Sequence, residues 1–539
     1  MEVIQLQLAS KNKLVNQYML NNDASLFHYH FQKEEDVFSR YDELMKRDFP
    51  RKQLAEHIKN YMQKFGMSSQ IEQSIQHLKE QDSVVVIGGQ QAGLLTGPLY
   101  TIHKVFSIIH DAKEKKKILN KPVVPIFWIA GEDHDILEVN HVYKLNDGML
   151  NKSTFEQKLR HKKQMVSKVS LNKEQLIAWI QDVFASFGET SYTKDVLSFI
   201  HDQIDEEMTY TEFFAKIINS CFKEYGLLLV DSAHPELRKI EQSYFKWMVE
   251  NGELVTDLLL EQQQELANEG YGNMIDSDKD NFQLFYEQQG ERVLLQYDRK
   301  NERVYAGENS FAKSDLLHMV EETPEKFSNN VVTRPLMQEF LFPTLSFIAG
   351  PGEISYWAEL KKIFEFAEIK MPIIVPRINI TYLERNIESD LNDLRLNIEN
   401  VLINGVEKDK HNFIESLKDK AIEETVETAR TEILAQYEKV YEKLRDFDKG
   451  MLPIIDKNSN FITNQLDYLL LKTEDAIKRK YHIVLNKYDR IGEALYPFSG
   501  FQERCWNIFY FLNQYGLEFI NEVCDEKFSC NGNHYVIKL

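Results

Sequence analysis

The sequence predicts an α/β protein: a doubly wound parallel sheet core with inserted segments, followed by a long antiparallel α-helical coiled-coil arm. Two observations predict this fold class. Up to about residue 380, short continuous apolar runs alternate with amphipathic helical segments, as is typical of parallel strands covered by helices on both faces. Beyond that point the chain is highly charged, nearly free of glycine, and carries apolar residues at heptad spacing.

Five apolar runs predict the strands of the core, and helical periodicity between them predicts the covering helices. We expect strands at residues 84–87, 123–129, 227–230, 345–348 and 373–375, and helices at 99–112, 211–222 and 356–366. Two stretches interrupt the alternation. Residues 145–208 are predicted to be a mostly helical insertion, and residues 251–330 an insertion with short strand-like pieces and one helical piece. The core domain is therefore predicted over residues 1–380.

Residues 381–494 are predicted to form the arm. One continuous helical segment is expected from 382 to 447, and a second helix follows the break at 449–453. Its apolar positions are Ile433, Tyr437, Val440, Leu444 and Phe447, then Ile462, Leu466, Leu469, Thr473 and Ala476. Such a hairpin cannot bury both of its faces, so either the core or a second copy must cover one, and we expect a homodimer. Residues 495–539 regain an aromatic-rich, globular composition and are expected to pack back on the core.

Composition excludes several classes of function. A formal net charge of −20 repels phosphate backbones and anionic lipid, so we expect no nucleic-acid and no membrane partner. The four cysteines show neither a CxxC pair nor a zinc-type spacing with histidine, which indicates reduced thiols and assigns no metal ligands. No signal peptide is apparent, and no apolar run approaches the ~20 residues of a membrane span. These features favour a cytoplasmic protein.

A glycine-rich turn is predicted directly after the first strand. Gly88 and Gly89 are expected to end the strand, and the following helix would offer unpaired N–H groups to an anion. The spacing fits no GxGxxG dinucleotide motif, and Leu94 and Leu95 stand where a P-loop needs Lys and Ser or Thr, so neither NAD nor ordinary ATPase chemistry is expected. A glycine-lined packing point is one interpretation and a small-molecule pocket the other. The pocket would use Gly89, Gln90, Gln91, Gly93, Thr96 and Gly97, with Lys104 as an anion contact.

A second cluster, Gly131-Glu132-Asp133-His134-Asp135, follows the strand at 123–129. Ligands of open α/β sheets bind outside the carboxyl ends of strands, where this cluster would lie. Three carboxylates around one imidazole could orient an amine, act as acid and base, or hold a divalent ion. A charge cluster that complements a helix dipole is the alternative. Asn140 follows closely and is expected to line the same cleft.

Two further strand ends carry candidate residues. Gly352, Glu353 and Tyr356 repeat the strand–glycine–helix pattern, and capping competes with substrate binding for Glu353. Arg377 closes the next strand, where it could hold a substrate carboxylate or form a structural ion pair. A later turn at residues 496–504 could bind an anion or simply re-enter the core.

Four segments make a family resemblance specific: GGQQAGLLTGPLYTIHK at 88–104, FWIAGEDHDILEVNH at 127–141, AGPGEISYWAEL at 349–360, and residues 496–504. Through them the chain resembles the bacillithiol biosynthesis cysteine-adding enzymes over essentially its full length. The resemblance implies a Rossmann-like core with inserted segments and a dimerising coiled-coil arm. It also implies a reaction that joins the carboxyl of cysteine to the glucosamine amine of glucosaminyl malate, and a pocket for an adenine nucleotide, ATP or ADP. Mg²⁺ could accompany the nucleotide, and the sequence leaves this metal requirement open.

The implied reaction leaves activation of the carboxylate to be explained. An amide cannot form from a free carboxylate at pH 7, because hydroxide is a poor leaving group, and the chain shows no HxGH or KMSKS-type signature of adenylate-forming relatives. We assign His134 and Asp133 the catalytic role of deprotonating the amine. The nucleotide is expected in the main cleft or in a second pocket built from Tyr496, Ser499, Gly500, Gln502 and Arg504. A non-catalytic scaffold that binds nucleotide and glucosaminyl malate for a separate ligase is the alternative function.

Overall fold

The structure is a computed structural model that describes residues 2–20 and 25–539. The chain divides into two compact units, which are described in turn. The core unit comprises the chain up to Tyr382 together with Gln502–Lys538, and the arm unit comprises Leu383–Phe501 with Leu539.

A five-stranded parallel sheet with the order β13-β12-β2-β3-β6 forms the centre of the core unit. Its strands are β2 (Val84–Gln90), β3 (Val123–Ile129), β6 (Leu228–Asp231), β12 (Thr344–Ala349) and β13 (Ile373–Pro376). Nearly all of their residues are buried, because helices cover both faces as continuous apolar runs require. The predicted Rossmann-like fold class and all five predicted strands are confirmed.

The prediction that Gly88 and Gly89 end the first strand is wrong. β2 continues through both glycines to Gln90, paired with β3 up to Ile129. Glycine is required there by close packing: a Cβ on Gly88 would lie 2.9 Å from Ile108 Cδ1, and one on Gly89 would lie 2.9 Å from the Trp128 carbonyl oxygen. The reversal comes later, at residues 91–99.

The helices differ from expectation mainly at their ends. α5 (Tyr100–Leu119) runs seven residues beyond its predicted end at 112, and α9 (Tyr210–Phe222) agrees closely with its prediction. The single helix expected at 356–366 is instead two, α14 (Pro351–Ala358) and α15 (Lys361–Phe366). The break coincides with buried Glu359, whose carboxylate accepts the backbone amides of Met274 and Ile275.

Both insertions contain more regular structure than the sequence indicates. The first opens with a hairpin, β4 (His141–Asn146) and β5 (Met149–Thr154), before helices α7 (Lys173–Phe187) and α8 (Thr193–His201), so its start is not helical. The second begins inside a long helix, α11 (Gln242–Asn268), and then forms an antiparallel sheet of order β10-β9-β8-β7-β11. Its strands are β7 (Asn281–Gln288), β8 (Glu291–Asp298), β9 (Arg303–Ala306), β10 (Asn309–Phe311) and β11 (Phe327–Asn329).

The amino- and carboxyl-terminal strands meet in a third sheet of the core unit. Its order is β1 (Glu2–Leu6), β15 (His534–Lys538) and β14 (Asn379–Leu383), with β1 and β15 antiparallel. Gln502 joins the same region, because its side chain accepts the Tyr382 amide at 2.8 Å and donates to the Tyr382 carbonyl at 2.9 Å.

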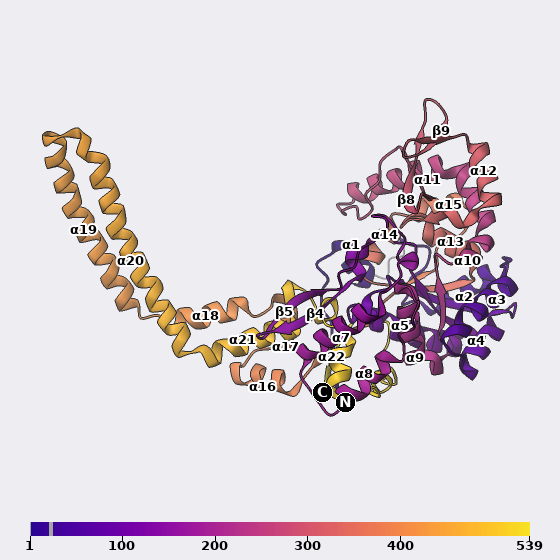
Figure 1. Cartoon of the computed structure of the whole chain (residues 1–539), viewed down its shortest axis with the longest axis horizontal. Helices are drawn as coiled ribbons and strands as arrows, with labels where there is room; N and C mark the ends of the chain where they lie inside the picture. The colour runs from indigo at the N-terminus through magenta and orange to yellow at the C-terminus, as the bar shows by residue number, and fades with distance from the viewer. Residues whose placement is uncertain (1, 21–24) are drawn as a thin grey trace. The chain divides into compact units, whose positions relative to one another are not determined.

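The arm unit is built around the antiparallel hairpin of α19 (Lys420–Phe447) and α20 (Leu452–Lys480), seen at one end of Figure 1. The hairpin is preceded by three shorter helices, α16 (Arg385–Leu394), α17 (Ile398–Asn404) and α18 (Glu407–Leu417), and followed by α21 (His482–Leu495). The single helix expected from 382 to 447 is therefore broken. Arg395 and Gly405 have positive φ angles of 54° and 72°, which end the first two helices.

Candidate active site

A cleft of about 600 Å³ opens at the carboxyl edge of the main sheet, within the core unit. This is where an open α/β sheet offers a ligand site. Eleven of the residues predicted to act in the site line it: Gly89, Gln90, Gln91, Lys104, Glu132, Asp133, Gly352, Glu353, Tyr356, Arg377 and Arg504. The cleft thus gathers the three predicted strand-end loops.

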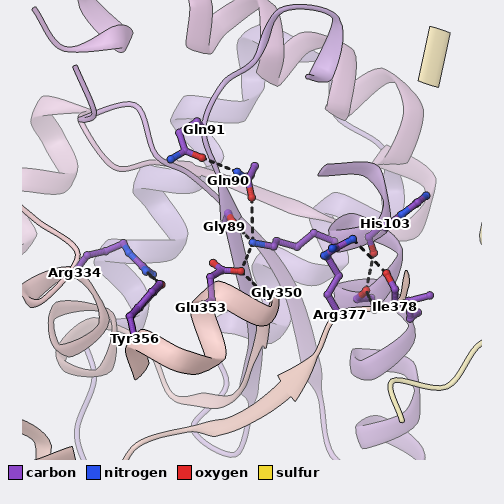
Figure 2. Close-up of polar contacts among 12 residues, drawn as sticks. Gly89, Gln90, Gln91, His103, Arg334, Gly350, Glu353, Tyr356, Arg377 and Ile378 are labelled. Atoms are coloured by element: carbon purple, nitrogen blue, oxygen red, sulfur yellow. Dashed lines mark hydrogen bonds and ion pairs between the residues drawn. The ribbon is translucent and has the colours of Figure 1, made fainter. Parts of the chain in front are cut away.

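Buried Lys104, on the first turns of α5, ties two of these loops together. Its ammonium donates to the Gly89 carbonyl at 2.6 Å, to Gln90 Oε1 at 3.2 Å and to Glu353 Oε2 at 2.6 Å (Figure 2). Glu353 also accepts the Gly350 amide at 2.7 Å, so the carboxylate caps α14 while it pairs with the lysine. Burial lowers the pKa of Lys104, and the attraction of Glu353 opposes that effect. The anion that Lys104 contacts is therefore internal.

The guanidinium of Arg377 is likewise paired with a carboxylate of the protein itself. It holds Glu503 in a bidentate pair at 2.6 and 2.7 Å, and both side chains are buried. His103 Nδ1 lies 2.9 Å from the same carboxylate. Of the two roles that the sequence left open for Arg377, the structure has the ion pair. Burial alone would raise the pKa of Glu503, but the charge of Arg377 and the hydrogen bonds from Arg377 and His103 hold it far below its usual range.

Two acidic residues of the loop after β3 have different surroundings: Glu132 is held by internal partners, and Asp133 is open to the cleft. Buried Glu132 accepts Arg238 Nη2 at 2.5 Å and the Asn329 amide at 3.0 Å, which fixes it in place. Asp133 lines the cleft, 3.4 Å from Gln91 Nε2 and 3.7 Å from Arg292 Nη1. Burial raises the pKa of Asp133, and the charge of Arg292 opposes the rise. Asp133 is thus a carboxylate whose proton affinity lies above that of an ordinary aspartate.

His134 faces the second insertion and is absent from the residues that line the cleft. Its Nδ1 lies 3.4 Å from Arg292 Nη1, and its ring packs edge-on against Phe285 at 5.9 Å between centroids. Burial and then the charge of Arg292 lower the pKa of His134, so the imidazole is neutral at pH 7 and can accept a proton.

Other predicted residues shape the surroundings of the cleft. Asp135 caps α6 (Ile136–Val139) by accepting the Leu137 amide at 3.1 Å, and Asn140 is buried at the carboxyl end of that helix. Gly93, Thr96 and Gly97 build the tight reversal after β2, in which a Cβ on Gly93 would lie 2.8 Å from Gly97 Cα. Asn507 secures this turn with a hydrogen bond of 2.7 Å to the Gly97 carbonyl.

The predicted nucleotide residues are divided between the two units. Gln502 and Arg504 belong to the core unit, where Gln502 is committed to the Tyr382 backbone and Arg504 lines the cleft. Tyr496, Ser499 and Gly500 belong to the arm unit, where the Tyr496 ring packs against Gly405.

Sequence reasoning missed four important residues of the site: Glu138, Arg292, Arg334 and Glu503. Arg334, at the start of α13 (Thr333–Leu341), lines the cleft, donates to Gln338 Oε1 at 3.2 Å and hydrogen-bonds the Tyr356 hydroxyl (Figure 2). Arg292 lies in an insertion strand and Arg334 in a helix without a recognisable motif, so no local signal marks either. Glu138 and Glu503 lie inside the segments 127–141 and 496–504, but only their surroundings in space give them a role.

Within residues 2–20 and 25–539, no group of three or more His, Cys, Asp or Glu side chains could hold a metal ion. Over the same described residues, no helix combines the length and the apolar character needed to cross a bilayer.

A doubly wound sheet with a mixed-charge cleft at its carboxyl edge, joined to a helical hairpin, defines a Rossmann-like α/β protein with a coiled-coil domain. The family models "Bacillithiol biosynthesis BshC, N-terminal Rossmann-like domain" and "Bacillithiol biosynthesis BshC, C-terminal coiled-coil domain" match residues 1–378 and 380–539. The chain belongs to the BshC family of bacillithiol biosynthesis.

Relatives in several bacteria cover the whole chain or nearly all of it. Proteins of Bacillus cereus (strain AH187) and Geobacillus sp. (strain WCH70) are each 40% identical over 100% of both chains. A protein of Bacillus cytotoxicus is 41% identical over 92% of both chains. All three carry the name "Putative cysteine ligase BshC".

Proposed function

We propose that this chain is a cysteine ligase, which forms an amide bond between the carboxyl group of L-cysteine and the glucosamine amine of glucosaminyl malate. The name of its relatives supports the reaction class. The observation that carries the proposal is the charge pattern of the cleft. Among the described residues, its lining includes two arginines without a carboxylate partner, Arg334 and Arg504, and two carboxyl groups with raised pKa values, Asp133 and Glu138.

The cationic side consists of Arg334 and Arg504. Among the described residues, neither has a carboxylate within ion-pair distance, whereas Lys104 and Arg377 are neutralised by Glu353 and Glu503. A guanidinium in this state is suited to bidentate binding of a carboxylate. Malate supplies two carboxylates that take no part in the reaction, so this side would hold the malate end of the acceptor.

The anionic side consists of Asp133 and Glu138, which suit an amine. Burial is the main cause that raises the pKa of each carboxyl group, so both accept a proton more readily than exposed acids do. In this proposal Asp133 removes a proton from the glucosamine ammonium, and neutral His134 beside it is the second candidate for that base. The free amine then attacks the activated carboxyl carbon of cysteine.

Activation of that carboxyl requires a co-substrate, for which we propose ATP with Mg²⁺. A cysteine carboxylate oxygen would attack phosphorus, releasing pyrophosphate to give an acyl adenylate or ADP to give an acyl phosphate. Attack by the amine then forms the amide and expels AMP or phosphate. Because Glu132 and Glu353 hold cationic partners and Asp133 is assigned to the amine, Glu138 is the cleft carboxylate that would hold Mg²⁺, which would supply positive charge to the phosphate groups.

The proposal extends to the setting of the enzyme. No disulfide joins any of the four cysteines (Cys221, Cys505, Cys524 and Cys530), all of which lie in the described part of the chain, and this supports a reducing cytoplasmic compartment. Exposed apolar residues at seven-residue spacing on α20 support a homodimer formed through the arm.

The deciding experiment incubates the purified protein with cysteine, glucosaminyl malate and ATP, and follows product by mass spectrometry and nucleotide by chromatography. We expect the amide product together with one equivalent of AMP or ADP, and the nucleotide released identifies the activated intermediate. Binding of glucosaminyl malate without turnover would contradict the ligase and support the non-catalytic scaffold instead. A sample that neither binds nor turns over the substrate would reject both.

A further inference from the structure

A second pocket of about 630 Å³ lies in the core unit and shares no lining residue with the cleft. One wall is a single face of α3 (Arg51–Met62) and its continuation to Lys64; the other is α10 (Pro235–Ile240), with the residues on either side of it. α3 and α10 pack directly against each other (Figure 1). The lining is mostly polar: Gln53, Glu56, His57, Asn60, Tyr61, Lys64, His234, Glu236, Lys239, Ile240, Gln242 and Ser243.

Two deeply buried side chains in this pocket have polar atoms without partners. His57 and Tyr61 are only 6% and 3% exposed, and among the described residues nothing hydrogen-bonds His57 Nε2 or the Tyr61 hydroxyl. Buried polar groups of native proteins are nearly always hydrogen-bonded. With His234, whose ring centroid lies 4.9 Å from that of His57 and 5.5 Å from that of Tyr61, they form a polar aromatic floor.

The floor and rim of the pocket are rich in hydrogen-bond donors. His234 Nδ1 accepts the Glu236 amide at 3.3 Å, which puts the proton of the neutral imidazole on Nε2. The ammonium groups of Lys64 and Lys239 stand at the rim, each paired at 2.7 Å with a solvent-accessible carboxylate. Such surface pairs are weak, so a ligand can replace them at little cost. A ligand with several acceptor oxygens fits this set of donors.

We infer that this pocket is a second small-molecule site, which binds an oxyanion such as a phosphate group by way of Tyr61, His57, His234 and the two rim lysines. Among the described residues, Glu56 is the carboxylate that lines the pocket without a lysine partner, and it opposes a bound anion. Its charge therefore supplies a test of sign: neutralising Glu56 strengthens binding of an anion but would weaken binding of a cation or amine.

α10 also links the second pocket to the cleft. Glu236, Lys239 and Ile240 face the pocket, whereas Arg238 between them is 1% exposed and donates to Glu132 and Glu241 at 2.5 and 2.6 Å. Glu132 lines the catalytic cleft beside Asp133. An anion that draws Lys239 and α10 toward the pocket would move Arg238, and with it the loop that holds Asp133. Because such coupling is reciprocal, a ligand in the cleft must change anion affinity by the same factor.

The test is calorimetric titration of the full chain with inorganic phosphate, and with a sugar phosphate, at constant ionic strength. We expect Tyr61→Phe to weaken phosphate binding about tenfold, and Glu56→Gln to strengthen it severalfold. Tyr210→Phe is the matched control, because the Tyr210 hydroxyl is also buried without a partner but does not line the pocket. A tighter sugar phosphate would identify a phosphorylated metabolite as the source of the anion.

Three results would overturn the inference: an adventitious ion only, with equal affinity in wild type and Tyr61→Phe; weaker binding in Glu56→Gln; or no binding of phosphate. The coupling has its own measurement. Saturating phosphate should change the affinity for glucosaminyl malate severalfold in wild type and leave it unchanged in Tyr61→Phe. Only this coupling measurement rests on the proposed function, and the direct measurement of phosphate binding is independent of it.

Discussion

At the scale of single residues, the cleft separates cations that hold the protein together from cations available to a substrate. Lys104 and Arg377 are buried and paired with Glu353 and Glu503, and removing either partner would leave an uncompensated buried charge. Within the described part of the chain, the guanidinium of Arg334 instead hydrogen-bonds a hydroxyl and an amide oxygen and pairs with no carboxylate. Basic side chains of one cleft therefore differ in role: some form internal ion pairs, and Arg334 remains available to a substrate.

Replacing Arg334 tests its proposed use. Arg334→Met should raise the KM for glucosaminyl malate at least about tenfold, because a charge-assisted hydrogen bond contributes about 1.5–3 kcal/mol. Arg334→Lys should recover part of the loss, since it keeps the charge without the bidentate geometry. Steady-state kinetics with glucosaminyl malate and with methyl glucosaminide, which lacks the carboxylates, measure the effect.

The control for this substitution is Arg303→Met. Arg303 lies in β9 of the second insertion, bonds Ser310 Oγ at 2.9 Å and does not line the cleft, so its loss should leave both KM values unchanged. If Arg334→Met impaired the two substrates equally, Arg334 would act on folding or on the common sugar and not on a carboxylate.

The proton-accepting group can be identified by comparing Asp133→Asn with His134→Asn. Asp133 lines the cleft, so Asp133→Asn should lower kcat about 10²–10⁴-fold, the usual contribution of a general base. His134→Asn, outside the lining, should cost less. Because burial raises the pKa of Asp133, wild-type activity should fall on the acid side at a higher pH than for an ordinary aspartate, as the carboxylate becomes protonated. A larger loss in His134→Asn, measured over the pH range, would transfer the role to the histidine.

At the scale of elements, the apolar patterns of the sequence predicted the strands well. Features that depend on contacts between distant segments could not be predicted from them. The five strands were predictable because continuous apolar runs are fully buried in the sheet. Gly88 and Gly89 misled, because glycine signals both a turn and a close approach to a neighbour, and only the position of Trp128 and Ile108 distinguishes the two. Most of the eleven lining residues could be predicted because they follow strand ends, which are recognisable in the sequence. Arg334 and Glu503 could not, because their partners, Tyr356 and Arg377, lie in segments distant along the chain.

In the arm, too, the sequence indicates which residues share a helix face but not what covers that face. The heptad spacing correctly predicted a hairpin and part of its seam. Ile433, Tyr437, Leu444, Ile462, Leu466 and Thr473 are half-buried, whereas Val440, Phe447 and Leu469 are 47%, 83% and 49% exposed. A four-three spacing specifies which residues share a face, and it leaves open whether that face meets the partner helix or solvent.

At the scale of the whole molecule, the outward face of the arm leads to a prediction about assembly. Ile454, Phe461 and Tyr468 recur every seven residues on α20 and are 57%, 63% and 56% exposed. A repeating apolar stripe of this kind is the surface that a second coiled coil buries. We therefore expect sedimentation at micromolar concentration to give twice the 63.4 kDa mass of one chain. Phe461→Glu should shift the protein to monomer by placing a charge in the interface. Met149→Glu, at a 59% exposed position in β5 of the core unit, should leave the mass unchanged. A wild-type monomer, or a dimer that survives Phe461→Glu, would show that the stripe is not the contact between subunits.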